Sequence, residues 1–216
     1  MAGEATRASE ASKATSFAVL RRAVGWVTAL NLGYFFVEIV VARRIDSVSL
    51  FADSIDFLED ATINGLILVA LGWTVRRRSQ VGMFLAGVLL VPGIATLWTA
   101  WGKLAEPVAP HPGALGLAGG GALAVNLFCA LLLARFRAEA GSLMRAAFLS
   151  ARNDALANVG IIAAGVVTAG TGSIWPDLAV GLAIFVMNFD AAVEVHRAAR
   201  RELHLAGFPA ERQHRS

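Results

Sequence analysis

Charged residues are scarce in this chain of 216 residues, because Asp, Glu, Lys and Arg together make up only 16% of it. Soluble domains carry about 25%. Hydrophobic residues reach 56%, and the mean hydropathy is +0.62. The shortage of charge excludes an ordinary soluble fold and favours helices that span a membrane.

Reactive side chains are also few. Cys129 is the only cysteine and lies in an apolar run, so the chain cannot build an internal disulfide or a thiolate metal cluster. The four histidines, His111, His196, His204 and His214, all fall outside the apolar stretches. No pattern for nucleophilic or redox catalysis is present. We therefore expect neither an enzyme nor a resident cofactor, and no nucleic-acid partner.

Six apolar stretches approach or exceed the length of about 20 residues that a helix needs to cross a bilayer. They are Val24–Ala42, Val48–Val75, Val81–Trp101, Ala114–Ala134, Ala146–Ala169 and Ile174–Val195. The sequence predicts an all-α membrane protein with six transmembrane helices at 21–196. A disordered, uncleaved tail is expected at 1–20 and a short basic tail at 197–216. The second stretch carries four acids, so a hydropathy average scores it weakly.

The basic residues indicate the orientation, because cytoplasmic loops keep an excess of Lys and Arg. Fifteen of the nineteen lie in the two tails, in the second and fourth connections or at Arg145, the entrance of the fifth stretch. Only Arg43, Arg44 and Lys103 lie on the other side. Six spans with both termini in the cytoplasm satisfy this pattern. The expected location is the inner (plasma) membrane, crossed several times.

Acidic side chains interrupt the second stretch. An Asp in the middle of a bilayer costs about 2.5–3.5 kcal/mol, so such residues face the bundle interior and mark a site or a pathway. Asp53, Asp56 and Asp60 share one helical face, because offsets of three, four and seven residues align at 3.6 residues per turn. Carboxylates this close repel each other, and a divalent cation, or protons in its absence, would relieve the repulsion. For Asp53, nearest the outer end, the alternative is a residue near water that caps the helix or forms a hydrogen bond.

The fifth stretch carries a second polar cluster, Ser150, Asn153 and Asp154. Ser150 and Asp154 share a face through their i,i+4 spacing, and Asn153 borders it. Asp154 lies about 12 Å from the cytoplasmic start of its helix, a depth comparable to that of Asp60 in a core roughly 30 Å thick. The two antiparallel helices can therefore bring these acids together at mid-membrane.

The predicted metal site consists of Asp56, Asp60 and Asp154, with its remaining ligand drawn from Ser150, Asn153, Asp53 or a water molecule. Two charged neighbours are assigned other roles. Glu59 lies about 100° from Asp60 around the helix and is expected to pair with a basic group or another helix. Arg152 is expected to be structural, as a counter-ion or as a snorkelling side chain.

Two segments, 31–38 (NLGYFFVE) and 47–61 (SVSLFADSIDFLEDA), resemble the first two helices of the cation diffusion facilitator family. That family has a Glu in helix 1, a Ser-x-Ser-Leu motif, and an Asp or His followed four residues later by Asp, the pair that Asp56 and Asp60 occupy. The segments 154–160 (DALANVG) and 175–177 (WPD) resemble its helix 5 and the start of its helix 6. The resemblance implies export of zinc or related divalent ions in exchange for protons, at a four-residue site shared by helices 2 and 5.

Two features differ from that family's pattern. Ser150 stands where the family has His or Asp, and the family's C-terminal cytoplasmic domain, which binds metal and supports dimers, does not follow the sixth stretch. The sequence therefore allows a homodimer but does not require one. A site of carboxylates and neutral oxygens is harder than one that contains His, so Fe²⁺, Mn²⁺ and Co²⁺ are alternatives to Zn²⁺.

Taken together, these features predict a metal/proton antiporter that works by alternating access. Its partners are the lipid bilayer, protons and a divalent metal carried as cargo. Two other functions stay open. One is a non-transporting membrane partner that kept the fold, and the other is a carrier of small organic cations in which the same acids are counter-charges.

Overall fold

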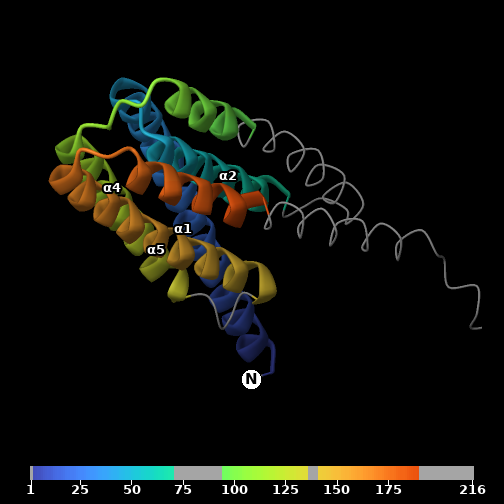
Figure 1. Cartoon of the computed structure of the whole chain (residues 1–216). Helices are drawn as coiled ribbons and strands as arrows, with labels where there is room; N and C mark the ends of the chain where they lie inside the picture. The colour runs from blue at the N-terminus through green and yellow to red at the C-terminus, as the bar shows by residue number, and fades with distance from the viewer. Residues whose placement is uncertain (1, 71–93, 136–140, 190–216) are drawn as a thin grey trace, which may run out of the picture.

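The computed structural model describes residues 2–70, 94–135 and 141–189. Within these residues the chain forms six helices and no strand: α1 (Ala2–Ile45), α2 (Val48–Ala70), a helix at 94–105, α4 (Pro112–Ala134), α5 (Gly141–Thr171) and a helix at Trp175–Phe189. The helices form an elongated bundle (Figure 1). The predicted all-α membrane fold is confirmed.

Three segments in the described part of the chain are long and apolar enough to cross a membrane: Phe17–Ile45, Pro112–Ala134 and Ser150–Thr171. α2 is also long enough, but its four acids lower its hydropathy, as the sequence predicts. The helices at 94–105 and Trp175–Phe189 are parts of two further predicted spans. Residues 81–93 and 190–195 of those spans, and the basic tail at 197–216, lie outside the described residues.

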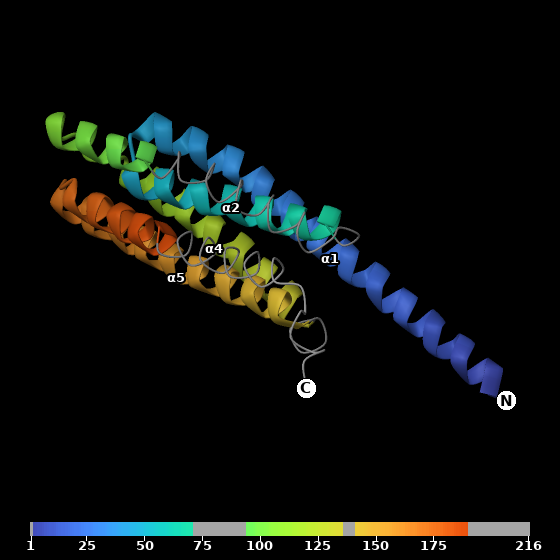
Figure 2. The same cartoon turned by 90° about the vertical axis from the view of Figure 1, so that its right-hand side faces the viewer.

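α1 is longer than the sequence predicts. It begins at Ala2, so it includes residues for which we expected a disordered tail. The physical reason is local composition, because residues 2–20 contain many Ala together with Glu, Lys and Arg, all good helix formers, and no proline. Figure 2 shows this N-terminal part of α1 extending beyond the other described helices.

Short connections join the helices at the end of the bundle that we expect to face outward. α1 and α2 are separated only by Asp46, whose φ is +53°, and Ser47. His111 caps α4 by accepting a hydrogen bond from the amide of Ala114 (3.2 Å), and Pro112 occupies the first turn, where its missing N–H costs nothing. Gly172, with a φ of +62°, provides the turn after α5.

One buried carboxylate ties the start of α2 to the helix Trp175–Phe189. Asp177 accepts hydrogen bonds from the hydroxyls of Ser47 and Ser49 (2.6 Å each) and from the amides of Val48 (2.8 Å) and Ser49 (3.2 Å). Two of these donors are backbone amides in the first turn of a helix, which have no partner within the helix itself. Asp177 thereby caps α2 together with Ser47, whose hydroxyl accepts from the amide of Leu50 (3.2 Å), although Asp177 is 129 residues away from Val48 in the chain.

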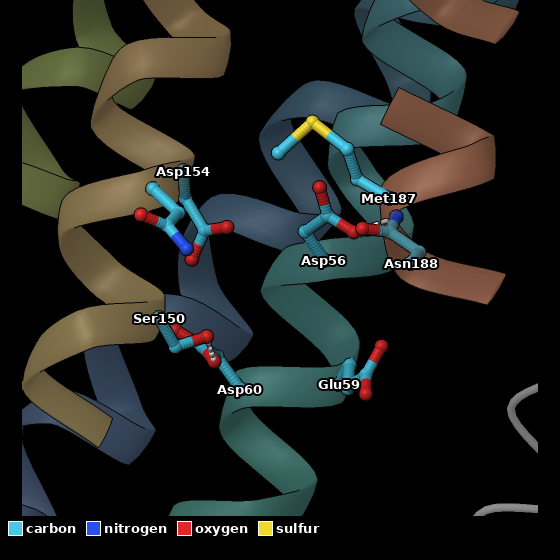
Figure 3. Close-up of a pocket in the computed structure, with 8 residues that line it drawn as sticks. Asp56, Glu59, Asp60, Ser150, Asp154, Met187 and Asn188 are labelled. Carbon is cyan, nitrogen blue, oxygen red and sulfur yellow. Dashed lines mark hydrogen bonds between the residues drawn. The ribbon is translucent and has the colours of Figure 1, made fainter. Parts of the chain in front are cut away.

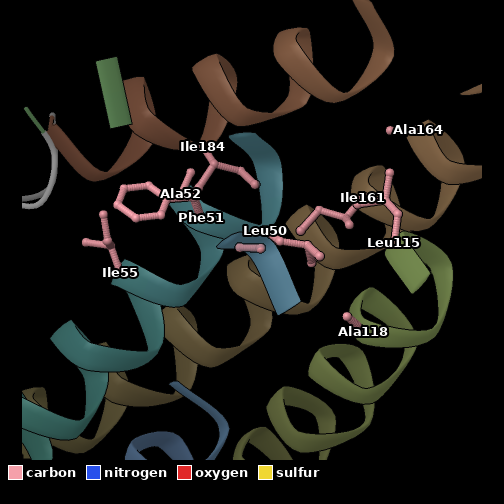
Figure 4. Packing of buried hydrophobic residues seen from close by; sticks show 10 residues of the cluster. Leu50, Phe51, Ala52, Ile55, Leu115, Ala118, Ile161, Ala164 and Ile184 are labelled. Atoms are coloured by element: carbon pink, nitrogen blue, oxygen red, sulfur yellow. The ribbon is translucent and has the colours of Figure 1, made fainter. Parts of the chain in front are cut away.

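Close backbone approaches hold the helices together. A Cβ at Gly119 would lie 2.9 Å from Ile161, and a Cβ at Gly181 would lie 2.8 Å from the backbone of Val48 and Ser49. Small residues of this kind allow membrane helices to pack tightly. The largest core cluster joins Leu50, Phe51 and Ile55 of α2 to Leu115, Ala118, Ile161, Ala164 and Ile184 of three other helices (Figure 4). This packing fixes the position of α2 among its neighbours.

Candidate metal site

Polar side chains are concentrated in the interior of the bundle. The buried acids and amides include Asn31, Glu38, Asp53, Asp56, Asp60, Asn64, Asn126, Asn158 and Asp177. Large apolar side chains such as Trp26, Leu117 and Val166 are exposed instead. A polar interior beneath an apolar surface is expected of a bundle in lipid, where ionisable groups turn away from the hydrocarbon.

A pocket of about 100 Å³ opens among these polar groups. It lies between α2, α5 and the helix Trp175–Phe189 (Figure 3). The residues that line it are Asp56, Glu59, Asp60, Ser150, Asn153, Asp154, Met187 and Asn188. Five of the six residues that the sequence predicts as ligands are therefore brought together in one place.

α2 supplies Asp56 and Asp60 to this pocket from one face, because they are four residues apart on a continuous helix. Only 8% of Asp56 and 7% of Asp60 are exposed. Each carboxylate accepts a hydrogen bond from a neutral group on another helix. The Ser150 hydroxyl donates to Oδ1 of Asp60 at 3.1 Å, and the side-chain amide of Asn188 donates to Oδ1 of Asp56.

α5 supplies the opposite wall, with Ser150 and Asp154 half-buried and Asn153 exposed at the pocket edge. The bond from Ser150 to Asp60 directly links the two helices that we predict to share the site. In Figure 3, Asp154 lies on α5 across the pocket from Asp56. The structure thus brings these side chains of α2 and α5 to one pocket, as the sequence predicts.

The pocket is strongly acidic. Four carboxyl groups line it, and the ion pair found among the described residues, Lys103 with Asp46 (3.1 Å), lies elsewhere. Arg152 is exposed and donates to Oδ1 of its neighbour Asn153 at 3.5 Å, so within the described residues it forms no ion pair with Glu59. Four acids that have no basic partner among the described residues favour a bound cation.

The acids are not closed around an ion in this arrangement. Among the described residues, no three His, Cys, Asp or Glu side chains are grouped so that they could hold a metal ion together. Two of the carboxylates are instead occupied by the hydroxyl of Ser150 and the amide of Asn188. Binding of a cation at this pocket therefore requires rotation of side chains toward a common centre.

Asp53 has different surroundings from the other two acids of α2. It is fully buried but is not among the pocket residues. Its Oδ2 accepts a hydrogen bond from Asn158 (2.5 Å), and Asn126 in turn donates to Asn158 (3.0 Å). The structure therefore places Asp53 outside the pocket and in a hydrogen bond, but away from water, unlike the alternative that the sequence offered. The nearby Glu38 is also fully buried and lies beside Asp53.

Three pocket residues were not predicted as ligands. Glu59 was assigned to another partner, yet it lines the pocket. Met187 and Asn188 come from the helix Trp175–Phe189, which sequence reasoning did not connect with the site. One signal was available, because Asn188 is the only strongly polar residue in the apolar segment 178–189. An isolated amide in such a segment usually has a partner in the bundle.

A comparison with protein families gave one match over most of the chain. Residues 26–204 match a family model described as the cation efflux transmembrane domain. A comparison with curated proteins found no match. The matched range contains every residue of the pocket.

Proposed function

This chain belongs to the cation efflux family, and on that basis we propose that it exports divalent metal ions from the cytoplasm in exchange for protons. The observation that carries the proposal is the pocket that Asp56, Asp60 and Glu59 of α2 line together with Asp154 of α5. Carboxylates in a membrane interior are costly unless they serve a site or a pathway. A divalent cation neutralises two of them at once.

Proton exchange follows from the chemistry of the ligands. A carboxylate must be deprotonated to bind a metal, so metal binding and proton binding compete for the same oxygens. The ion enters from the cytoplasm, binds Asp56, Asp60 and Asp154, and leaves on the outer side as protons return to these acids. A proton gradient directed inward then drives the metal outward.

The donor atoms support a hard or borderline cation. Besides the thioether of Met187, the pocket offers carboxylate, hydroxyl and amide oxygens, and no imidazole or thiolate from the described residues. Oxygen ligands suit Mn²⁺ and Fe²⁺, whereas Zn²⁺ prefers a set that includes N or S. We therefore place Mn²⁺, Fe²⁺ and Co²⁺ beside Zn²⁺ as cargo. An inner-membrane location, and assembly as a homodimer, remain predictions.

Metal uptake into everted membrane vesicles tests the proposal. We expect proton-dependent uptake of a divalent ion by the wild-type protein and its loss in Asp154→Ala, because one missing carboxylate leaves the cation under-neutralised. Glu106→Ala is the matched control, since Glu106 is an exposed acid outside the pocket.

Two results would support a different function. Vesicles without metal uptake, at normal expression of the wild-type protein, would favour a membrane partner that does not transport. Uptake that small organic cations compete away would favour an organic-cation carrier.

A further inference from the structure

Asn188 stands in the same relation to Asp56 as Ser150 does to Asp60. Each side chain is neutral, comes from a helix other than α2, and donates a hydrogen bond to Oδ1 of an α2 carboxylate in the pocket. The resemblance to the cation diffusion facilitators places their site on helices 2 and 5 and assigns nothing to helix 6. The pocket in this chain nevertheless has a third wall, built by the helix Trp175–Phe189.

The position of Asn188 is held by contacts along the whole of that helix. Asp177 caps the start of α2, Gly181 lies against the backbone of Val48 and Ser49, and Ile184 packs in the core cluster with Phe51. Figure 4 shows Ile184 close to Phe51 and Ala52. The helix therefore follows α2 from its first turn to Asp56. This packing against α2 fixes the position of Asn188 in the pocket.

An amide can serve a carboxylate site in two ways. Its NH₂ group donates to a carboxylate when no cation is present, as Asn188 does to Asp56. Its carbonyl oxygen is a neutral ligand for hard divalent cations. The terminal torsion of Asn is broad, so a rotation about it exchanges the two groups without moving the helix.

We propose that Asn188 is a ligand of the transported cation, supplied by a third helix, and that it sets the preference of the site for ions that take many oxygen ligands. This inference rests on the proposed metal transport. Zn²⁺ usually takes four ligands, and three carboxylates together with Ser150 or a water molecule supply that number. Mn²⁺ takes about six oxygens and depends more on each additional one. Loss of the amide oxygen therefore weakens Mn²⁺ binding more than Zn²⁺ binding.

The test is a Mn²⁺/Zn²⁺ competition titration on the purified full chain, with three variants beside the wild type. Asn188→Ala removes the oxygen and is expected to lower Mn²⁺ affinity about tenfold, with a smaller change for Zn²⁺. Asn188→Asp keeps an oxygen in place and is expected to retain or tighten Mn²⁺ binding. Val186→Ala, an exposed position on the same helix, is the matched control and is expected to bind as the wild type does.

The outcomes separate this inference from the proposed function. Unchanged Mn²⁺ affinity in Asn188→Ala, with loss of binding in Asp154→Ala, would overturn the role of Asn188 alone. Equal losses for both ions in Asn188→Ala and Asn188→Asp, together with a lower melting temperature, would show a purely structural contact and also overturn it. A wild-type protein that binds neither ion would overturn both proposals.

Discussion

At the scale of single residues, Ser150 is where this chain departs from the family that it resembles. Its hydroxyl bonds to Asp60 at 3.1 Å and it lines the pocket, so the residue at this position is within reach of a bound ion. A hydroxyl contributes a neutral oxygen, whereas an imidazole contributes the nitrogen that Zn²⁺ prefers. The identity of this one side chain therefore bears on which ion the site prefers.

Ser150→His is expected to raise the ratio of Zn²⁺ to Mn²⁺ affinity roughly tenfold, which corresponds to about 1.4 kcal/mol. The spacing of four residues places the new imidazole on the same face as Asp154. Competition titration on purified protein measures the ratio, with transport assayed in parallel because an ion that is held more tightly is released more slowly. Ser150→Ala is the control for loss of the hydroxyl alone. An unchanged ratio in Ser150→His would place Ser150 outside the ligand shell.

The sequence could identify part of this site and had to miss the rest. Asp56, Asp60, Ser150 and Asp154 stand out because charged or polar residues at helical spacing are rare in apolar stretches. Asn188 shares a helical face with Asp177, Gly181 and Ile184, but it is the only strongly polar residue in segment 178–189 and no acid accompanies it there. Its role depends on the approach of one helix to another, which the spacing of residues within a helix does not reveal.

At the scale of helices, the cap that Asp177 provides joins two elements that are far apart in the chain. The approximate positions of the helices followed from apolar stretches of about 20 residues, although α1 and α5 begin before their predicted starts. The contact with Asp177 did not, because it comes from 129 residues away; the local sequence shows only Ser47, whose hydroxyl accepts a hydrogen bond from the amide of Leu50 (3.2 Å). The motif at 175–177 was recognised only as a resemblance. The structure gives it a physical role, which is to satisfy four donors at the start of α2.

Asp177→Ala is expected to destabilise the protein, because buried donors left without a partner cost about 1–3 kcal/mol each. A loss of that size lowers the melting temperature by about 2–4 °C for each kcal/mol in a chain of this length. Asp177→Asn keeps one oxygen acceptor and is expected to lose less. Thermal melting of the purified protein in detergent measures both, with Glu106→Ala as the control. A melting curve of Asp177→Ala that coincides with the wild-type curve would contradict this role.

At the scale of the whole molecule, charge separates the two ends of the bundle. Lys103 donates to the backbone carbonyl and, at 3.1 Å, to the carboxylate of Asp46, so the last turn of the helix at 94–105 lies beside the turn between α1 and α2. The few basic residues on the predicted outer side gather near this end. Most other basic residues belong to the tails and to connections that we expect in the cytoplasm.

Both termini are expected in the cytoplasm, because anchoring fifteen basic residues there satisfies the asymmetry of Lys and Arg. An alkaline phosphatase reporter, active only in the periplasm, is fused after Ser216 and gives no activity if this topology is correct. The same reporter fused after Pro110, in the loop before α4, is the positive control and is active. Strong activity of the fusion after Ser216 would overturn the orientation and, with it, the assignment of export.

Two consecutive hydrogen bonds connect three helices: they join Asn126 of α4 to Asn158 of α5, and Asn158 to Asp53 of α2. Neither lipid nor bulk water can replace a partner lost in the hydrocarbon layer, so a shift of α5 along α2 by a single residue would leave these groups unpaired. This series of hydrogen bonds therefore fixes the register of α5 against α2, and with it the depth of the pocket. The lipid-facing residues carry no such constraint. We expect substitutions among relatives to concentrate on that outer surface, while Asn126, Asn158 and Asp53 stay the same.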